Sequence, residues 1–247
     1  MKIISLANQK GGVAKTTSTY NLAASKALKN NRVLMIDLDP QASLTISCGF
    51  APGTLDFSTC HLFDGKTDPL DCGYRVKTIE NLYIVPSDIE LAEVEQAITG
   101  KTAREKLLRK AVKPFEDYFD YVFIDCPPQL GILTTNALVA STNVIIPSKA
   151  EYLSYRGIRA LKRTIKNVVE EDLNNSLTLD GFIITMFEKN INDQKDMLEQ
   201  FKKEDAVLGI IKKSADTYRN ILDGVPVVVS NPKSDVAVAY TEIAEKL

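Results

Sequence analysis

The stretch NQKGGVAKTT, residues 8–17, combines lysines, glycines and threonines at a spacing that suits phosphate binding. Glycines let backbone N–H groups approach a phosphate, a lysine neutralises its charge, and a hydroxyl can bind Mg²⁺. The usual phosphate-binding loop reads G-x-x-x-x-G-K-[ST], and this stretch has Gln9 and Ala14 in place of the two outer glycines. Lys15 and Thr16 still fit the last two positions. The stretch therefore predicts a nucleotide phosphate site with a modified loop.

A second lysine, Lys10, precedes the glycine pair Gly11 and Gly12, and Lys15 opens a segment of helical character. The unpaired N–H groups of a loop and a helix start form a cradle for phosphate, which the helix dipole reinforces. In such a site Lys15 would reach the β- and γ-phosphates, and the Thr16 hydroxyl would bind Mg²⁺. A ligand-free turn between a strand and a helix is the alternative. Two lysines and paired threonines favour nucleotide binding.

Two acidic clusters lie further along the chain, each directly after an apolar run. Asp37 and Asp39 follow the run VLMI, and Asp125 follows YVFI. Residues at i and i+2 of a strand point to the same side, so the first pair is expected to share one direction. An apolar strand ending in aspartate has the form of a Walker B strand, whose carboxylate holds Mg²⁺ or its water. A capping aspartate is the alternative for either cluster alone, but together with the loop they predict one site.

Apolar runs of strand length alternate with amphipathic segments of helix length along the whole chain. The expected strands are 2–7, 32–37, 82–86, 120–125, 143–147, 180–186, 206–211 and 226–229. The expected helices are 16–29, 88–98, 102–113, 131–140, 154–171, 192–203 and 234–246. Several strands are almost continuously hydrophobic, which is typical of strands buried on both faces of a parallel sheet. The alternation predicts an α/β fold with a doubly wound, mostly parallel sheet and helices on both faces. Ligands bind at the carboxyl ends of such strands, where the three polar clusters fall.

Length and composition set further expectations. A length of 247 residues suits a single domain over residues 1–247, with residues 49–80 as an insertion of loop and short helix. The net charge of −2 and the pI of about 5.6 exclude a protein that is basic overall, so DNA contacts would need a local patch. Four scattered cysteines and one histidine argue against a disulfide frame, a metal site built from cysteine or histidine, and a histidine triad. No signal peptide or membrane-spanning run is evident, so we expect a cytoplasmic protein.

These motifs resemble those of the deviant Walker A ATPases, and among them the ParA-type partition proteins of the Soj branch. The loop of that family reads K-G-G-x-x-K-[ST], which residues 10–16 match. The family often has glycine at the position of Ala14. Similar segments continue at DLDPQAS (37–43), DCPPQLGILTTNAL (125–138), IIPSKAEYLSYRGI (145–158), ITMFEKN (184–190) and PKSDVAVAYTEIAEKL (232–247). The resemblance therefore covers nearly the whole chain.

The resemblance implies roles for individual residues. Lys10 matches the signature lysine, which reaches across a dimer interface to phosphates in the partner's site, and Thr17 matches an α-phosphate contact. Asp39 matches the residue that positions the attacking water, and Asp125 the residue that supports the metal. The implied catalytic residues are Lys10, Lys15 and Asp39, and the implied metal-site residues are Thr16, Asp39 and Asp125. The implied nucleotide-binding residues are Lys10, Gly11, Gly12, Val13, Ala14, Lys15, Thr16, Thr17 and Met186.

Two further segments acquire a meaning from the resemblance. Pro128 and Gly131 fall in the segment equivalent to switch II, and Thr185, Met186 and Phe187 are expected near the adenine. The implied activity is slow ATP hydrolysis that requires Mg²⁺, with ATP and Mg²⁺ as cofactors. Catalysis at such a site consists mainly of positioning and charge stabilisation.

The resemblance also implies partners. An ATP-bound homodimer would bind DNA non-specifically, and a ParB-type centromere-binding protein would supply specificity and stimulate hydrolysis, which implies a nucleoid-associated protein. The candidate DNA contacts are Lys189, Lys212, Lys213, Arg219 and Lys233. Phosphate contacts need only point charges, so a patch doubled by dimerisation could suffice. A second basic run at 101–113 is interpreted as a solvated helix face, which is the usual meaning of a charge run.

Three alternatives share much of the site. A MinD-type membrane ATPase would need a basic amphipathic helix at the C-terminus, whereas this sequence stops soon after its last expected helix, so we expect no membrane contact. An iron–sulfur scaffold protein of the same superfamily would need suitably placed cysteines, and the sequence has no C-x-x-C pair. A DNA-binding regulator switched by ATP would have the same site chemistry, so sequence does not separate it. Because the loop begins at residue 10, we expect no N-terminal helix-turn-helix extension.

Overall fold

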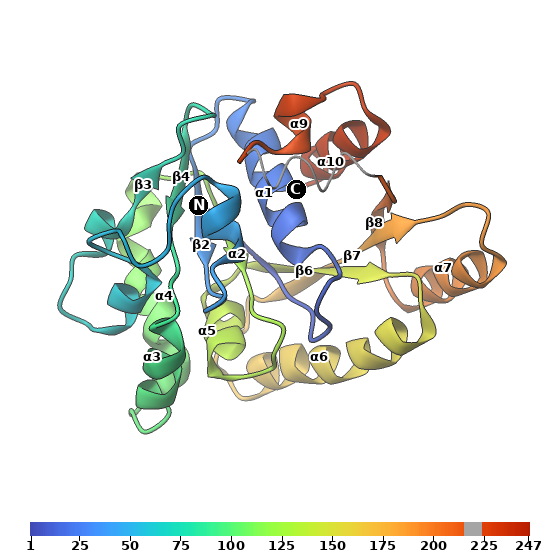
Figure 1. The fold of residues 1–247 in the computed structure, drawn as a ribbon. Coiled ribbons are helices and arrows are strands. Elements are labelled where there is room, and N and C mark those ends of the chain that lie inside the picture. Colours follow the sequence, from blue (N-terminus) through green and yellow to red (C-terminus); the bar gives the residue numbers. More distant parts are fainter. Residues whose placement is uncertain (215–223) are drawn as a thin grey trace.

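An eight-stranded sheet forms the centre of the computed structural model, which describes residues 1–214 and 224–247 (Figure 1). The strands are β1 Lys2–Leu6, β2 Val33–Asp37, β3 Tyr74–Arg75, β4 Leu82–Val85, β5 Tyr121–Asp125, β6 Asn143–Lys149, β7 Thr178–Phe187 and β8 Val207–Lys212. Their order across the sheet is β3-β4-β2-β5-β1-β6-β7-β8. All neighbouring pairs are parallel except β3 with β4. The predicted doubly wound, mostly parallel sheet is confirmed.

Helices cover both faces of the sheet. The α-helices are α1 Lys15–Ala27, α2 Ser43–Ser47, α3 Leu91–Ile98, α4 Leu107–Val112, α5 Ile132–Ala140, α6 Tyr152–Glu170, α7 Asn192–Glu204, α9 Val227–Ser230 and α10 Asp235–Glu245. The short 3₁₀ helices are η1 Thr59–Phe63, η2 Pro69–Cys72, η3 Arg104–Lys106 and η4 Lys113–Asp117. Helices α1, α2, α9 and α10 pack on one face, and α3 to α7 pack on the other (Figure 1).

The strands divide their side chains between these two layers. In β5, Val122 and Ile124 join the core under α3 to α7, whereas Phe123 joins the core under α1 and α10. Successive strand residues point to opposite faces, so a strand that is covered on both sides must be apolar throughout. This explains why runs such as YVFID predict the central strands well.

The structure corrects two expected elements and adds one that was not expected. Residues 226–229 were expected to form a strand, but Val227–Ser230 is the short helix α9. Pro226 precedes this helix, and the backbone N–H of Val228 donates to the Asn21 side chain on α1. The expected helix 102–113 is divided into η3 and α4. Helix α2, Ser43–Ser47, was not expected. In α9, the consecutive valines at 227–229 favour a strand on average, but packing against α1 decides the local conformation.

The segment 49–80 contains loops and the short helices η1 and η2, as predicted, and also the short strand β3, which was not predicted. Its residues Leu62, Phe63 and Cys72 are buried in the same core as the sheet. Across residues 1–214 and 224–247, no helix combines the length and the apolar character needed to cross a membrane.

Candidate nucleotide-binding site

The three polar clusters of the sequence meet at one edge of the sheet. Leu6 at the end of β1 and Asp37 at the end of β2 both lie in register with Asp125, which ends β5 between them. The loop after β1 then leads directly into α1. Because all three strands are parallel, their carboxyl ends open on the same side. The arrangement brings the glycine-rich loop and the aspartates into a single site.

The loop presents free backbone donors to an open space. A side chain added at Gly11 or Gly12 would meet no atom within 4 Å, and Gly12 has a φ of 67°. Within the described part of the chain, the N–H groups of Gly11, Gly12 and residues 15–17 have no acceptor. The first N–H groups of a helix point outward along its axis and carry its positive end. The loop therefore fits the phosphates of a nucleotide.

Ala14 lies at the N-cap of α1 with φ 61° and ψ 36°, in the left-handed region. A residue with a β-carbon is strained there by about 1–2 kcal/mol, whereas glycine is not. The preference for glycine at this position therefore has a backbone cause, and Ala14 keeps the same turn at a cost in stability.

Asn8 fixes the start of the loop, although the sequence analysis assigned it no role. Its side-chain amide donates to the carbonyl of Pro147 on β6 at 2.7 Å, and its carbonyl accepts from the Lys10 N–H at 2.9 Å. At the other end of the loop, the Thr185 hydroxyl on β7 donates to the Val13 carbonyl at 3.1 Å. The neighbouring strands thus hold the loop at both ends, and β7 brings the segment of Met186 beside it.

Thr16 and Asp125 form the centre of the candidate metal site. The Thr16 hydroxyl donates to Asp125 Oδ2 at 2.6 Å, and Thr19 donates to Oδ1 at 3.3 Å. Mg²⁺ is usually held by one or two protein oxygens together with substrate phosphates, and not by a cage of protein ligands. In the described residues, no group of three or more histidines, cysteines and acidic residues could hold a metal alone. The Thr16–Asp125 pair therefore suits Mg²⁺ that arrives with a nucleotide.

Burial shifts the pKa values of two charged groups in the site. Burial raises the pKa of Asp125 to about 8, and the nearby Asp37 adds to this shift. The Thr16 hydrogen bond and Lys15 act in the opposite direction. Burial lowers the pKa of Lys15, while the negative charge of Asp125 opposes that shift. Buried groups with shifted pKa values are typical of functional sites.

The two aspartates after β2 have different surroundings. Asp37 is fully buried, and its Oδ2 accepts from the Thr45 N–H at 2.9 Å and the Thr45 hydroxyl at 2.7 Å. Its Oδ1 accepts from the Asp39 N–H at 3.1 Å. Both carboxylate oxygens of Asp37 therefore hold the loop in place. Asp39 is only half-buried, and its Oδ1 accepts from the Gln41 N–H at 3.0 Å. The two carboxylates therefore differ in what they do: Asp37 supports the turn, and Asp39 is the more accessible group.

Lys10 is bound outside its own phosphate loop. Its ammonium group donates to Glu151 Oε2 at 2.6 Å and to the Ser154 hydroxyl at 3.0 Å. Glu151 is the N-cap residue of α6, and Ser154 lies in the first turn of that helix. Glu151 and Ser154 are further positions to which the sequence analysis assigned no role, because 141 residues separate Glu151 from Lys10 in the chain.

The candidate DNA contacts differ in how much positive charge they leave free. Lys212 pairs with Asp235, and Lys213 pairs with Glu188 at 3.0 Å. Lys189 and Lys233 are exposed, and neither has an ion pair with another described residue. Arg219 lies outside the described residues.

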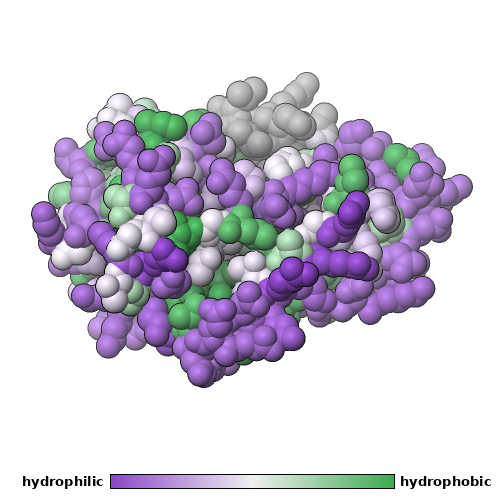
Figure 2. Space-filling view, turned by 90° about the horizontal axis from the view of Figure 1, so that it is seen from below, coloured by the Kyte–Doolittle hydropathy of each residue, from purple (hydrophilic) through white to green (hydrophobic). Residues whose placement is uncertain are grey.

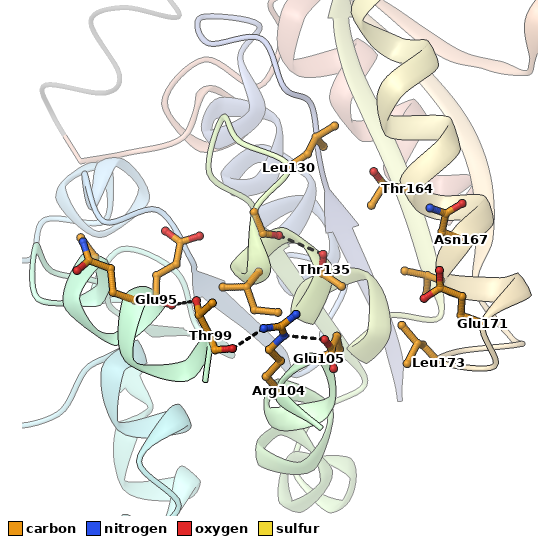
Figure 3. Close-up of a pocket in the computed structure, with 15 residues that line it drawn as sticks. Glu95, Thr99, Arg104, Glu105, Leu130, Thr135, Thr164, Asn167, Glu171 and Leu173 are labelled. Carbon is orange, nitrogen blue, oxygen red and sulfur yellow. Dashed lines mark hydrogen bonds and ion pairs between the residues drawn. The ribbon is translucent and has the colours of Figure 1, made fainter. Parts of the chain in front are cut away.

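A separate hollow of about 820 Å³ lies between α3, α5 and α6, as Figure 3 shows. Arg104 lines this hollow, and its guanidinium group donates to the Thr99 carbonyl and, at 2.9 Å, to Glu105 Oε1. The Glu95 carboxylate packs directly against Gly131, where an added β-carbon would lie 2.5 Å from Glu95 Oε1. Leu130, Gly131 and Ile132 therefore border this hollow, whereas no residue of the phosphate loop lines it.

Comparisons with known proteins agree with the site. The AAA domain family model matches residues 1–179. The sporulation initiation inhibitor protein Soj of Bacillus subtilis is 33% identical over 249 residues, covering 100% of this chain and 98% of that protein. The chain belongs to the ParA/MinD-type P-loop ATPases. Another ParA/MinD-type relative, the chromosome partitioning protein ParA of Myxococcus xanthus, is 32% identical over 100% of this chain and 87% of its own length.

A solved structure agrees with this membership. The cobyrinic acid a,c-diamide synthase of Mycobacterium smegmatis, with a bound ATP analogue and magnesium, has a TM-score of 0.85 to this ParA/MinD-type ATPase. The two chains are 32% identical, and the match covers 99% of this chain and 93% of that one.

Proposed function

We propose that this protein is a magnesium-dependent ATPase whose ATP-bound dimer binds DNA non-specifically and drives DNA partition with a ParB-type partner. ATP hydrolysis with magnesium follows from membership of the ParA/MinD-type P-loop ATPases. The observation that carries the dimer is the position of Lys10. Its ammonium group is bound by Glu151 and Ser154. In the same loop, Lys15 is the lysine that we assign to the phosphates. Lys10 is therefore not committed to the phosphates of its own loop, and it would reach a second subunit after leaving Glu151.

The residues of this site support hydrolysis by positioning. The free N–H groups of the loop would bind the phosphates, and Lys15 would neutralise charge on the transferred group. Mg²⁺ would supply further neutralisation of the phosphate oxygens, held through Thr16 and Asp125. Asp39, the accessible aspartate after β2, would orient the attacking water. Because Asp37 holds the turn that contains Asp39, the orientation of that water would depend on Asp37 as well.

A lysine supplied by the other subunit would act on the transition state as an arginine finger does. Hydrolysis would then depend on dimerisation, and a monomer would bind ATP without turning it over efficiently. We propose that residues 1–247 act in this way as a single ATPase domain.

The proposed output is partition and not membrane positioning. The whole chain matches the sporulation initiation inhibitor protein Soj and the chromosome partitioning protein ParA. Similarity to a chromosome partitioning protein favours DNA as the surface to which this chain binds. The last described helix, α10, buries Val236, Tyr240 and Ile243 in the core beside α1, so its apolar face is not free to enter a membrane. We therefore propose nucleoid association, with Lys189, Lys212, Lys213 and Lys233 among the candidate contacts and a ParB-type protein as the stimulating partner.

A sedimentation experiment tests the proposal. The protein is mixed with long duplex DNA or with anionic liposomes, each with ATP, with ADP or without nucleotide, and light scattering reports its oligomeric state. We expect a dimer and DNA co-sedimentation with ATP alone, and no liposome binding in any state. ATP-dependent liposome binding would favour the MinD-type alternative, and an ATP-bound monomer that ignores DNA would contradict the proposal.

A further inference from the structure

Helix α6 places a row of cations on its exposed side. Between Tyr152 and Glu170 the helix has five basic residues and a single acidic residue, Glu170, at its end, although the whole chain has 30 basic and 32 acidic residues. Four of the α6 cations, which we call the α6 stripe, follow one another at intervals of three, four and three residues: Arg156, Arg159, Arg163 and Lys166. Positions at this spacing lie on one side of a helix, and all four side chains are exposed.

The opposite side of α6 fixes the direction of the stripe. Ile158, Leu161 and Ile165 are buried in the core beneath the sheet. The helix cannot rotate without exposing them, so the stripe must face outward. Figure 2 views the molecule from the side on which α6 lies in Figure 1, and strongly hydrophilic side chains gather there.

Two of the four cations in the stripe have no carboxylate partner among the described residues. Arg156 and Arg163 form no ion pair with any residue in the described part of the chain, whereas Lys166 pairs with Glu170 at 3.2 Å. Arg159 lies near Glu204. On the C-terminal side of the molecule, by comparison, Lys212 and Lys213 are each paired with a carboxylate. Arg156 and Arg163 are therefore better placed than those lysines to attract an anion.

We infer that the α6 stripe contacts the phosphate backbone of nucleic acid. This inference rests on the proposed DNA binding and adds a second surface to it. The stripe extends over eleven residues of helix, a rise of about 15 Å, and so could meet several phosphates of one duplex. Guanidinium groups bind phosphate oxygens in pairs, which suits arginine better than lysine. The stripe contains no aromatic residue that could stack on bases, so the contact is independent of sequence.

The stripe is also tied to the nucleotide site. Glu151 and Ser154, which hold Lys10, belong to the N-terminal end of the same helix, and Arg156 follows Ser154 by two residues. An ATP-bound dimer would present two such stripes. The two stripes would raise the charge that faces DNA without any change in the charge of one chain.

The test compares Arg156→Ala/Arg163→Ala with a matched control on and beside α4, Lys110→Ala/Lys113→Ala, which removes the same charge from exposed positions. Binding of a short fluorescent duplex is followed by anisotropy with ATP and Mg²⁺ over a range of salt concentrations. The α6 variant should bind roughly tenfold more weakly at low salt. The slope of log affinity against log salt should fall by about 0.9 for each phosphate that the variant no longer neutralises, and thus by up to about 3.6 for four arginines in a dimer.

Three further measurements make the result specific. Arg156→Lys/Arg163→Lys should keep most of the affinity, and all variants should still bind ATP and dimerise. Equal losses of affinity in the α6 and α4 variants would mean a general charge effect and would overturn the inference, as would an α6 variant with wild-type affinity and slope. Stripe-dependent binding to phosphatidylserine vesicles without any effect on DNA would also overturn it. A wild-type protein that ignores the duplex would instead overturn the proposed function itself.

Discussion

At the scale of single residues, the site separates positions that hold structure from positions that are free to act. Asp37 uses both carboxylate oxygens to hold Thr45 and Asp39, whereas Asp39 has an oxygen without a partner in the described part of the chain. Sequence spacing predicts both aspartates but does not distinguish them, because the distinction depends on Thr45, eight residues beyond Asp37.

Asp39→Ala tests the assignment of the accessible carboxylate. The variant should bind ATP and dimerise, since the loop, Lys10 and Lys15 are intact, but hydrolyse ATP at least about tenfold more slowly because the water loses its orienting group. A phosphate-release assay measures the turnover. Wild-type turnover would show that another residue orients the water.

Asp125→Asn tests the electrostatic strain at the buried carboxylate of the candidate metal site. Because burial raises the pKa of Asp125 to about 8, the folded protein binds this proton more tightly than the unfolded chain, whose aspartate pKa is about 3.9. The stabilising contribution is complete below about pH 4 and is lost as the pH rises toward 8. A neutral asparagine avoids that loss, so nucleotide-free Asp125→Asn should melt several degrees higher than wild type at pH 8, at about 2–4 °C per kcal/mol.

The advantage of Asp125→Asn should shrink as the pH falls toward 5, where the wild-type carboxyl is protonated. The variant should also lose the additional stabilisation that MgATP gives to the wild type. Asp56→Asn, at an exposed carboxylate, is the matched control and should shift the melting temperature little. A variant that is less stable than wild type at pH 8 would contradict the strain.

At the scale of elements, the sequence predicts the central sheet well and the contacts between distant elements poorly. VLMID and YVFID become β2 and β5 because strands covered on both faces must be apolar. PVVVS at 226–230 shows the limit, since its valines suggest a strand but packing against α1 makes a helix. The α6 stripe is visible at helical spacing, yet buried residues interrupt it in the chain, so it does not appear as a continuous charge run.

The contact between Lys10 and α6 gives a prediction at this scale. Lys10 must leave Glu151 before it can reach a second subunit, so Glu151→Gln should favour the dimer. Partly exposed ion pairs contribute about 0.2–1 kcal/mol, and two pairs open per dimer, so the ATP-bound dimer should tighten by roughly two- to thirtyfold.

The measurement is the dimer dissociation constant by sedimentation in an Asp39→Ala background, in which ATP is preserved. Glu170→Gln is the control, because it removes a carboxylate from the other end of α6, where it pairs only with Lys166 among the described residues. A weaker dimer in Glu151→Gln would mean that Glu151 contributes to the interface itself.

At the scale of the whole molecule, the proposed function depends on a second copy of the chain and on DNA as well as on one ATPase site. The fold and the loop are predictable from sequence because glycines, lysines and apolar runs have local meanings. The assembly is not, because the direction of Lys10 and the exposure of α6 arise only from the folded chain. The central claim is that Lys10 completes the site of the other subunit.

Mixing two inactive variants tests that claim most directly. Lys10→Ala alone should bind ATP but fail to dimerise, and Asp39→Ala alone should dimerise but hydrolyse poorly. In a mixed dimer, the Lys10→Ala subunit keeps its own Asp39 and receives Lys10 from the other subunit, so one complete site forms. ATP turnover in the mixture should lie well above that of either variant alone. A mixture that stays inactive, although the mixed dimer is shown to form, would contradict it.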